Sequence, residues 1–214
     1  MKDYISSIRT DYTKSYLDEN DLLVSPIYQF VKWLDLAIQT NVQEANMMVL
    51  STVSADGFPN SRVMLLKDVT EDGFVFFTNY LSVKGLELED NPKANLTFFW
   101  ADREQQVRIK GLVTKISREQ SVEYFDSRPS GSKISVCVSE QSSVVKDRQE
   151  LEDKARRLGA NKFGKEIKCP EYWGGYILKP IEIEFWQGRA DRLHDRLKYV
   201  LNNNGKWEII RLAP

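Results

Sequence analysis

Hydrophobic and polar positions along the chain follow two different spacings. Residues 1–24 are polar and mixed in charge, whereas positions 27, 30, 31, 34 and 38 are apolar and recur at the spacing of one helix face. Ser25 suits an N-cap, and Pro26 suits the first helical position. The pattern therefore predicts a polar N-terminal arm followed by an amphipathic helix that ends near Thr40.

From Met47 onward the spacing changes to that of strands. MMVLSTVSA, SRVMLLKDV and FVFFTNY are separated by short turns that contain Gly57 and Gly73, which predicts three antiparallel strands. A short helix over 82–91 follows. ANLTFFWA and QQVRIKGLVTKI, connected through ADRE, then restore the strand pattern. We expect five strands in this part of the chain.

Helical signals return after the fifth strand. Ser117 and Gln120 have the spacing of a capping box, which predicts a helix that runs through Phe125. We expect residues 128–132 to break this helix, and further helix with polar interruptions to continue to about Leu158.

The last part of the chain again has the character of strands. YILKPIEIEFWQG, DRLHDRLKYVL and KWEIIRL predict a meander, with a bend or a sheet edge at Pro180. Two blocks of strands, with helices between and around them, predict an α+β protein built on an antiparallel barrel or a strongly bent sheet. With 214 residues, one domain over 25–214 plus the arm is favoured over two domains.

Composition narrows the class of protein. Thirty basic residues balance 31 acidic ones, so the broad positive charge of a nucleic-acid binder is absent. No apolar run approaches the roughly 18 residues that span a bilayer, and the first residues lack the apolar core of a secretory signal. Cys137, Cys169 and the single histidine, His194, predict neither a disulfide scaffold nor a metal site. We expect a cytoplasmic protein without membrane or nucleic-acid partners.

Several polar segments could bind an anion, although the glycine-rich phosphate-binding motifs are missing. In RVMLLK, Arg62 and Lys67 flank four apolar residues and would lie on opposite faces of a regular strand. Residues 124–132 combine a phenol, a guanidinium and hydroxyls that could converge on one anion. The amides and hydroxyls of 105–108 and 139–143 suit a heteroaromatic edge or a phosphate. Each segment has a structural alternative: a core strand with charged ends, a capped loop, or polar surface.

The segment EFWQGRADRLHDR, residues 184–196, concentrates four cationic or cation-capable side chains near a tryptophan. If a strand begins at position 191, Arg192, His194 and Arg196 project from one face. Such a row of like charges favours a bound anion over an exposed polar face, which is the structural alternative.

IEFWQGRADRLHDR, together with RVMLLKD, FTNY, QVRIKG, YFDSRPSGS, SEQSS, WGGY and the terminal RLAP, resembles the pyridoxamine (pyridoxine) 5′-phosphate oxidase family. The resemblance extends from about residue 5 to Pro214. It implies a homodimeric FMN-dependent oxidase with a split-barrel fold and two flavins in the dimer cleft. Such an enzyme converts the 4′-amine or 4′-alcohol of its substrate to the aldehyde of pyridoxal 5′-phosphate, and O2 to hydrogen peroxide.

Matched by motif, the resemblance also implies site residues. The FMN contacts would be Arg62, Val63, Met64, Leu65, Leu66, Lys67, Phe77, Thr78, Lys84, Gln106, Gln141, Ser142, Trp186 and Arg196. The substrate phosphate would meet Lys67, Tyr124, Arg128 and Ser132. Arg192 and His194 would be catalytic and lie over the substrate ring, and Arg9 and Tyr12 would belong to an arm over 1–24 that closes over the site.

Two positions depart from the family pattern. Phe77 stands where tyrosine is common, and Val83 stands where arginine or serine is common. Each change removes a polar group beside the expected flavin.

Three other functions stay open at this point. A carrier would bind pyridoxal 5′-phosphate without forming peroxide. A nicotinamide-dependent split-barrel reductase, against which RLHDR argues, would reduce flavin with NAD(P)H. A structural module would bind no FMN.

Overall fold

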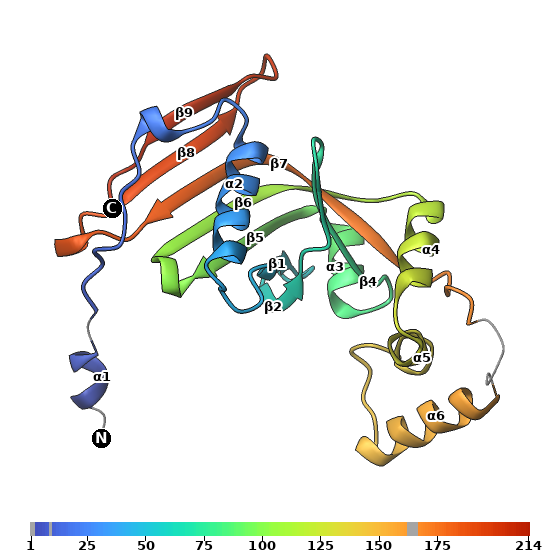
Figure 1. The fold of residues 1–214 in the computed structure, drawn as a ribbon. Helices are drawn as coiled ribbons and strands as arrows, with labels where there is room; N and C mark the ends of the chain where they lie inside the picture. The colour runs from blue at the N-terminus through green and yellow to red at the C-terminus, as the bar shows by residue number, and fades with distance from the viewer. Residues whose placement is uncertain (1–2, 9, 162–166) are drawn as a thin grey trace.

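The computed structural model describes residues 3–8, 10–161 and 167–214 (Figure 1). Its strands are β1 (Met47–Val53), β2 (Pro59–Leu65), β3 (Asp68–Thr70), β4 (Gly73–Asn79), β5 (Lys93–Trp100), β6 (Gln105–Lys115), β7 (Trp173–Gln187), β8 (Asp195–Leu201) and β9 (Trp207–Arg211). Its helices are α1 (Asp3–Ser7), α2 (Pro26–Gln39), α3 (Val83–Asp90), α4 (Arg118–Ser127), α5 (Ser130–Val138) and α6 (Arg148–Asn161). Short 3-10 turns cover Glu19–Asp21, Ala101–Arg103 and Ala190–Arg192.

The strands of the described residues form one antiparallel sheet in the order β2-β1-β5-β6-β7-β4-β3, with β8 added to β7 and β9 added to β8. The long strand β7 pairs with β6 along one edge. Its other edge pairs first with β4 and then with β8. The sheet curves around α2, while α4, α5 and α6 gather at one end (Figure 1). The predicted α+β class with an antiparallel split barrel is confirmed.

Pro180 lies in the stretch of β7 where the second edge changes partner from β4 to β8. Proline has no N–H to donate to a ladder, so a position between two partners suits it. The register with β6 also shifts here, because Gly111 pairs with Pro180 while Lys110 pairs with Glu182. Ile181 is therefore an extra residue, as in a β-bulge. The predicted bend at Pro180 is confirmed.

The three strands predicted between Met47 and Tyr80 are four in the structure. The meander predicted for the last part of the chain is present as β7, β8 and β9. SRVMLLKDV does not form one strand, because β2 ends at Leu65 and β3 begins at Asp68. Leu66 is buried in the core, and the Lys67 N–H donates to the carbonyl of Val75. The Leu66 N–H instead donates to the carbonyl of Asn46, next to β1, so the backbone changes partner between these two residues and Arg62 and Lys67 do not share one regular strand. β2 pairs with β1, whereas β3 pairs with β4.

The helix starts agree with their sequence signals. The Ser25 side chain accepts from the Tyr28 N–H at the start of α2, and Ser117 and Gln120 form the complete capping box of α4. Ser82 caps α3 by accepting from the Gly85 N–H. None of the described helices is long and apolar enough to cross a membrane.

The predicted break over 128–132 is shorter in the structure. α4 runs to Ser127, two residues beyond Phe125, and α5 already begins at Ser130. Only Arg128 and Pro129 separate the two helices. Pro129 ends α4 because it has no N–H, and its carbonyl accepts from the Ser132 N–H in the first turn of α5.

The core lies between the inner face of the sheet and α2. Phe30 is fully buried, and its ring centroid lies 4.9 Å from those of Phe74 on β4 and Phe98 on β5. Trp100 follows at 6.1 Å. One α2 side chain therefore contacts two strands, β4 and β5, that are not neighbours in the sheet.

We predict that Phe30→Ala lowers the free energy of unfolding by about 3–5 kcal/mol, because it removes a buried ring and leaves a cavity. Phe58→Ala is the matched control. Phe58 is 70% exposed in the β1–β2 turn, so its loss should cost less than about 0.5 kcal/mol. Urea unfolding of both variants at one protein concentration checks this. Equal losses would contradict the assignment of Phe30 to the core.

Candidate functional site

A cavity of about 370 Å³ lies beside the end of β2, β4 and helices α4 and α5. Eight of the predicted site residues line it: Met64, Leu65, Lys67, Phe77, Thr78, Tyr124, Arg128 and Gln141. Sequence analysis missed five further lining residues: Asn79, Ser135, Val136, Ser139 and Trp173. Asn79, Ser139 and Trp173 belong to FTNY, SEQSS and WGGY, so the motifs contained a signal for these three. For Ser135 and Val136 on α5 the sequence offered none.

Aromatic rings form one wall of this cavity. The ring of Phe77 stacks on Tyr124, with centroids 3.9 Å apart, and lies 5.5 Å from Trp173. The Arg128 guanidinium lies 4.9 Å from the centroid of the Trp173 ring. Burial raises the pKa of Tyr124 more than the nearby Arg128 charge lowers it. The phenol therefore remains a hydrogen-bond donor at neutral pH.

Arg128, in the same wall, has a buried nitrogen, Nη1, that lacks a hydrogen-bond partner among the described residues. A buried donor left without a partner costs free energy, and a guanidinium matches the oxygens of a phosphate or carboxylate. Lys67 lines the same cavity from an exposed position at its rim. The pair makes the cavity suited to an anion.

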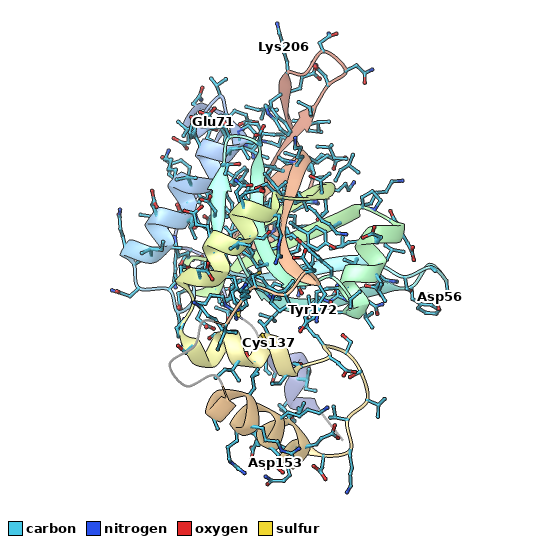
Figure 2. The ribbon with its side chains drawn as sticks, turned by 90° about the vertical axis from the view of Figure 1, so that its right-hand side faces the viewer. Asp56, Glu71, Cys137, Asp153, Tyr172 and Lys206 are labelled. Carbon is cyan, nitrogen blue, oxygen red and sulfur yellow. The ribbon has the colours of Figure 1, made fainter. Side chains whose placement is uncertain are left out.

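A second cavity of about 950 Å³ lies among α3, α5 and α6. It shares Gln141 with the first cavity and includes Ser142, whose Oγ accepts from the backbone N–H of Val83 at 3.3 Å. The Thr78 hydroxyl donates to Gln141 at 3.4 Å. Figure 2 shows Cys137 and Tyr172 beside each other at this end of the molecule. Ser132 lies in the first turn of α5 and does not line either cavity.

Two cationic residues with predicted flavin contacts, Arg62 and Lys84, lie near each other in this part of the chain. Arg62 Nη2 lies 3.3 Å from the Glu87 carboxylate. Lys84 is 7% exposed and donates to Ser82 Oγ at 3.2 Å. Burial and, to a smaller extent, the Arg62 charge lower the pKa of Lys84. Two nearby cations therefore face one carboxylate, which leaves a positive excess that favours an anion.

Two apolar residues of the predicted flavin segment point in different directions. Val63 is 60% exposed on the edge strand β2, whereas the Leu66 side chain is buried in the core. Only the backbone of Leu66 is therefore available to a ligand.

Gln106, Trp186 and Arg196 form one row across three strands. Gln106 on β6 pairs with Trp186 on β7, which pairs with Arg196 on β8. Directly paired residues share a sheet face, and the adjacent row of Val107, Phe185 and Leu197 is buried, so this row lies on the outer face. Arg196 is fixed there by Glu184 Oε1 at 2.8 Å and by the carbonyl of Ala213 at 2.8 Å.

The predicted strand from position 191 is wrong. Asp191 and Arg192 have left-handed backbone angles, φ 56° and 61°, within a 3-10 turn, and β8 begins only at Asp195. Arg192, His194 and Arg196 therefore do not project from one strand face. His194 Nδ1 accepts from the backbone N–H of Arg189 at 3.1 Å. The neutral ring consequently carries its proton on Nε2, where it can donate to a ligand.

Tyr12 packs against this same loop. Its ring centroid lies 5.6 Å from Trp186 and 5.7 Å from His194. The following backbone is fixed by two carboxylates, since the Lys14 N–H donates to Glu104 and the Leu17 N–H to Asp195. The arm is thus packed from Tyr12 onward. Arg9, the other predicted arm residue, lies outside the described residues.

Ion pairs also hold the arm to the sheet near Glu19. Arg211 on β9 lies 2.6 Å from the Glu19 carboxylate and 3.1 Å from Asp195. The hydrogen bond from Arg211 lowers the pKa of Glu19 to about 2. This ion pair persists through the neutral and mildly acidic pH range, and it weakens only as the pH falls through about 2.

The predicted site residues therefore fall into two sets. The cavity set lies near α3, α4 and α5, and the loop set consists of Tyr12, Trp186, Arg192, His194 and Arg196 with Gln106. No described residue of the loop set lines either cavity. β8 and α4 also lie at opposite ends of the molecule in Figure 1. One chain does not bring the two sets together.

Comparisons with known proteins match the chain to one family along its length. A family model described as pyridoxamine 5′-phosphate oxidase matches residues 34–162, and one described as the pyridoxine 5′-phosphate oxidase C-terminal dimerisation region matches residues 173–214. A pyridoxine/pyridoxamine 5′-phosphate oxidase of Leptospira interrogans is 47% identical over 214 residues and covers all of both chains. One from Ralstonia pickettii is 49% identical over 210 residues, covering 98% of this chain and 99% of its own.

Solved structures support the fold. PhzG from Burkholderia lata, in complex with tetrahydrophenazine-1-carboxylic acid, superposes with a TM-score of 0.88 at 30% identity, covering 94% of this chain and 98% of its own. A pyridoxamine 5′-phosphate oxidase-related, FMN-binding protein from Nostoc punctiforme superposes with a TM-score of 0.70 at 16% identity, covering 90% and 100%. The second likeness shows the fold alone.

We predict that Gly188→Ala releases the arm from the loop set. A Cβ at this position would lie 2.7–3.0 Å from atoms of Tyr12, so the ring must move away from Trp186 and His194. Backbone amides over 12–18 should then exchange hydrogen roughly tenfold faster, as measured by mass spectrometry. Gly131→Ala, where a Cβ meets nothing within 4 Å, is the control and should leave the exchange unchanged. Unchanged exchange in Gly188→Ala would refute the contact.

Proposed function

The chain belongs to the pyridoxamine 5′-phosphate oxidase family, and on that basis we propose that it oxidises pyridoxamine 5′-phosphate and pyridoxine 5′-phosphate to pyridoxal 5′-phosphate. The C4′ amine or alcohol loses two electrons and becomes the aldehyde, and O2 is reduced to hydrogen peroxide. The amine substrate also releases ammonia after water is added. The cofactor we propose is FMN.

The residues present fit FMN. Arg62 and Lys84 carry two positive charges, and Glu87 carries one negative charge beside them. The remaining positive charge can pair with the phosphate of the cofactor. Thr78, Gln141 and Ser142 supply polar groups around the two adjoining cavities. When bound, FMN supplies the two-electron acceptor that passes the electrons to O2.

The proposal for the substrate rests mainly on the environment of Arg128. Its buried Nη1, which has no hydrogen-bond partner among the described residues, belongs to a side chain that lines a cavity together with Lys67 and Tyr124. We assign these three residues to the substrate phosphate, with Ser132 at the start of α5 as a fourth donor. Charge-assisted hydrogen bonds at one end of the substrate would fix the position of its ring and of C4′.

Arg192 and His194 have the proposed role of holding the other side of the substrate ring. The Arg189 N–H occupies His194 Nδ1, which leaves Nε2–H as a donor. We therefore infer that neutral His194 orients a polar substituent of the ring and does not remove a proton through Nε2. Arg192 is exposed on the same loop, and we assign its guanidinium to a polar group of the ligand.

Two chains are needed for this arrangement, because the cavity set and the loop set lie apart in one chain. The outer face of β1, β2 and β5 supports a homodimer, since it exposes Met47, Val49, Val63, Leu65 and Phe99. Leu65 also lines the cavity, so this apolar surface is continuous with the site. We propose that a second copy covers it and that the flavin lies at the interface.

The arm has the proposed role of a lid over a single domain formed by residues 25–214. Tyr12 lies against Trp186 and His194, which are predicted to contact the flavin and the substrate. Closure by residues 1–24 would exclude water from the reacting atoms.

The proposal predicts that the purified protein, mixed in air with FMN and pyridoxamine 5′-phosphate, forms pyridoxal 5′-phosphate and peroxide in equal amounts. Aldehyde absorbance and a peroxide assay follow the two products. Pyridoxamine without the phosphate should have a kcat/KM at least about 100-fold lower, because the bonds to Lys67 and Arg128 are lost.

Two results would contradict the proposal. Tight binding of pyridoxal 5′-phosphate without peroxide would identify a carrier. Flavin reduction by NAD(P)H, with no reaction of the phosphorylated substrate, would identify a reductase.

A further inference from the structure

Glu87 on α3 is a buried carboxylate to which neither motif nor resemblance assigns a role. Its side chain is 6% exposed, and three donors surround it. Oε2 accepts from the Thr52 hydroxyl at 2.5 Å and from Arg62 Nη2 at 3.3 Å. Oε1 accepts from the amide of Asn60. Buried carboxylates are retained where their partners require them, because desolvation is costly.

The same cluster fixes Arg62 from a second side. Arg62 Nη1 donates to Thr52 Oγ1 at 2.5 Å, so the hydroxyl accepts from Arg62 while it donates to Glu87. Nη1 also lies 3.4 Å from the carbonyl of Leu50. Both terminal nitrogens of the guanidinium are therefore oriented by β1 and α3 before any ligand binds.

Glu87 remains charged in this setting. Burial raises the pKa of its carboxyl, but the hydrogen bonds from Thr52 and Asn60 and the charge of Arg62 together lower it further. Burial and, to a smaller extent, the Arg62 charge lower the pKa of Lys84, and the negative charge of Glu87 offsets part of this effect. The cluster as a whole keeps one net positive charge.

We propose that Glu87 is a positioning residue that holds the Arg62 guanidinium in the orientation needed to bind the phosphate of FMN, and that it thereby favours FMN over riboflavin. The inference rests on the proposed function, which assigns Arg62 and Lys84 to the cofactor. A donor oriented in advance loses less entropy when the phosphate binds, so the benefit falls on the phosphorylated flavin alone.

Glu87→Gln tests this role. Both carboxylate oxygens face donors, so an amide NH2 at either position would meet another donor and displace Arg62 or Asn60. The dissociation constant of FMN, measured by quenching of flavin fluorescence, should rise at least tenfold. That of riboflavin should change less than about twofold, because riboflavin has no phosphate to contact Arg62.

Glu89→Gln is the matched control. It removes the same charge two residues further along α3, from an exposed side chain paired with Lys115 at 2.7 Å. Both flavins should bind it as they bind the unchanged protein. If the unchanged protein itself binds no FMN, the proposed function fails, and this outcome is distinct from failure of the positioning role.

Two further variants separate positioning from a loss of structure. Thr52→Val removes the hydroxyl that links Glu87 to Arg62, so it should also weaken FMN and spare riboflavin. In an Arg62→Met background, Glu87→Gln should have no additional effect on FMN binding, because Glu87 acts through Arg62. The thermal midpoints of all FMN-free variants show which of them fold. If Glu87→Gln does not fold, the comparison of FMN and riboflavin binding is made with Thr52→Val instead.

Three results would overturn the inference. Equal weakening of FMN and riboflavin would mean that Glu87 only stabilises the fold. Unchanged FMN binding would mean that Arg62 is held by other groups. Tighter FMN binding would mean that the carboxylate repels the phosphate.

Discussion

The structure depends on the pairing of one strand. β7 is 15 residues long and binds β6 along one edge, while its other edge is divided between β4 and β8. The barrel is open at Pro180, where this edge changes partner. As a result β4 and β8 lie at different ends of β7. The cavity set then lies beside β4, and the loop set lies at the far end of β7. A site that needs both sets requires a second chain.

Positive charge that the chain only partly neutralises is the second constraint. Arg62 and Lys84 share Glu87, and Arg128 keeps a buried nitrogen without a partner among the described residues. Such groups destabilise a protein unless an anion meets them. Two phosphates, one on the proposed cofactor and one on the proposed substrate, would supply that anion at both places.

Local signals in the sequence were sufficient for most elements. Ser25 and Ser117 marked helix starts because capping depends on neighbours within one turn, and Pro180 marked the bend because it lacks an N–H. The strand spanning Leu66 was predicted wrongly because the alternation continues through that residue, whereas the change of hydrogen-bond partner from Asn46 to Val75 is decided by tertiary contacts. The turn at Asp191 and Arg192 was missed because left-handed angles are uncommon for residues other than glycine, and alternation alone favoured a strand.

Only part of the candidate site could be predicted from the sequence. Motifs identified eight residues of the cavity, but nothing local indicated Glu87, whose role depends on contacts with Thr52 and Arg62 from elsewhere in the chain. The resemblance implied two flavins in a dimer cleft, but the sequence did not indicate that one chain keeps Arg192 and Arg128 apart.

Subunit complementation tests the central claim that two chains share one site. One chain carries Arg128→Met, the other carries Arg192→Met, and each has its own affinity tag so that mixed dimers can be purified after co-expression. Each variant alone should be nearly inactive. The mixed dimer contains one intact site of two if the sets come from different chains, so it should recover about half of the unchanged activity. A mixed dimer as inactive as its parents would contradict a shared site.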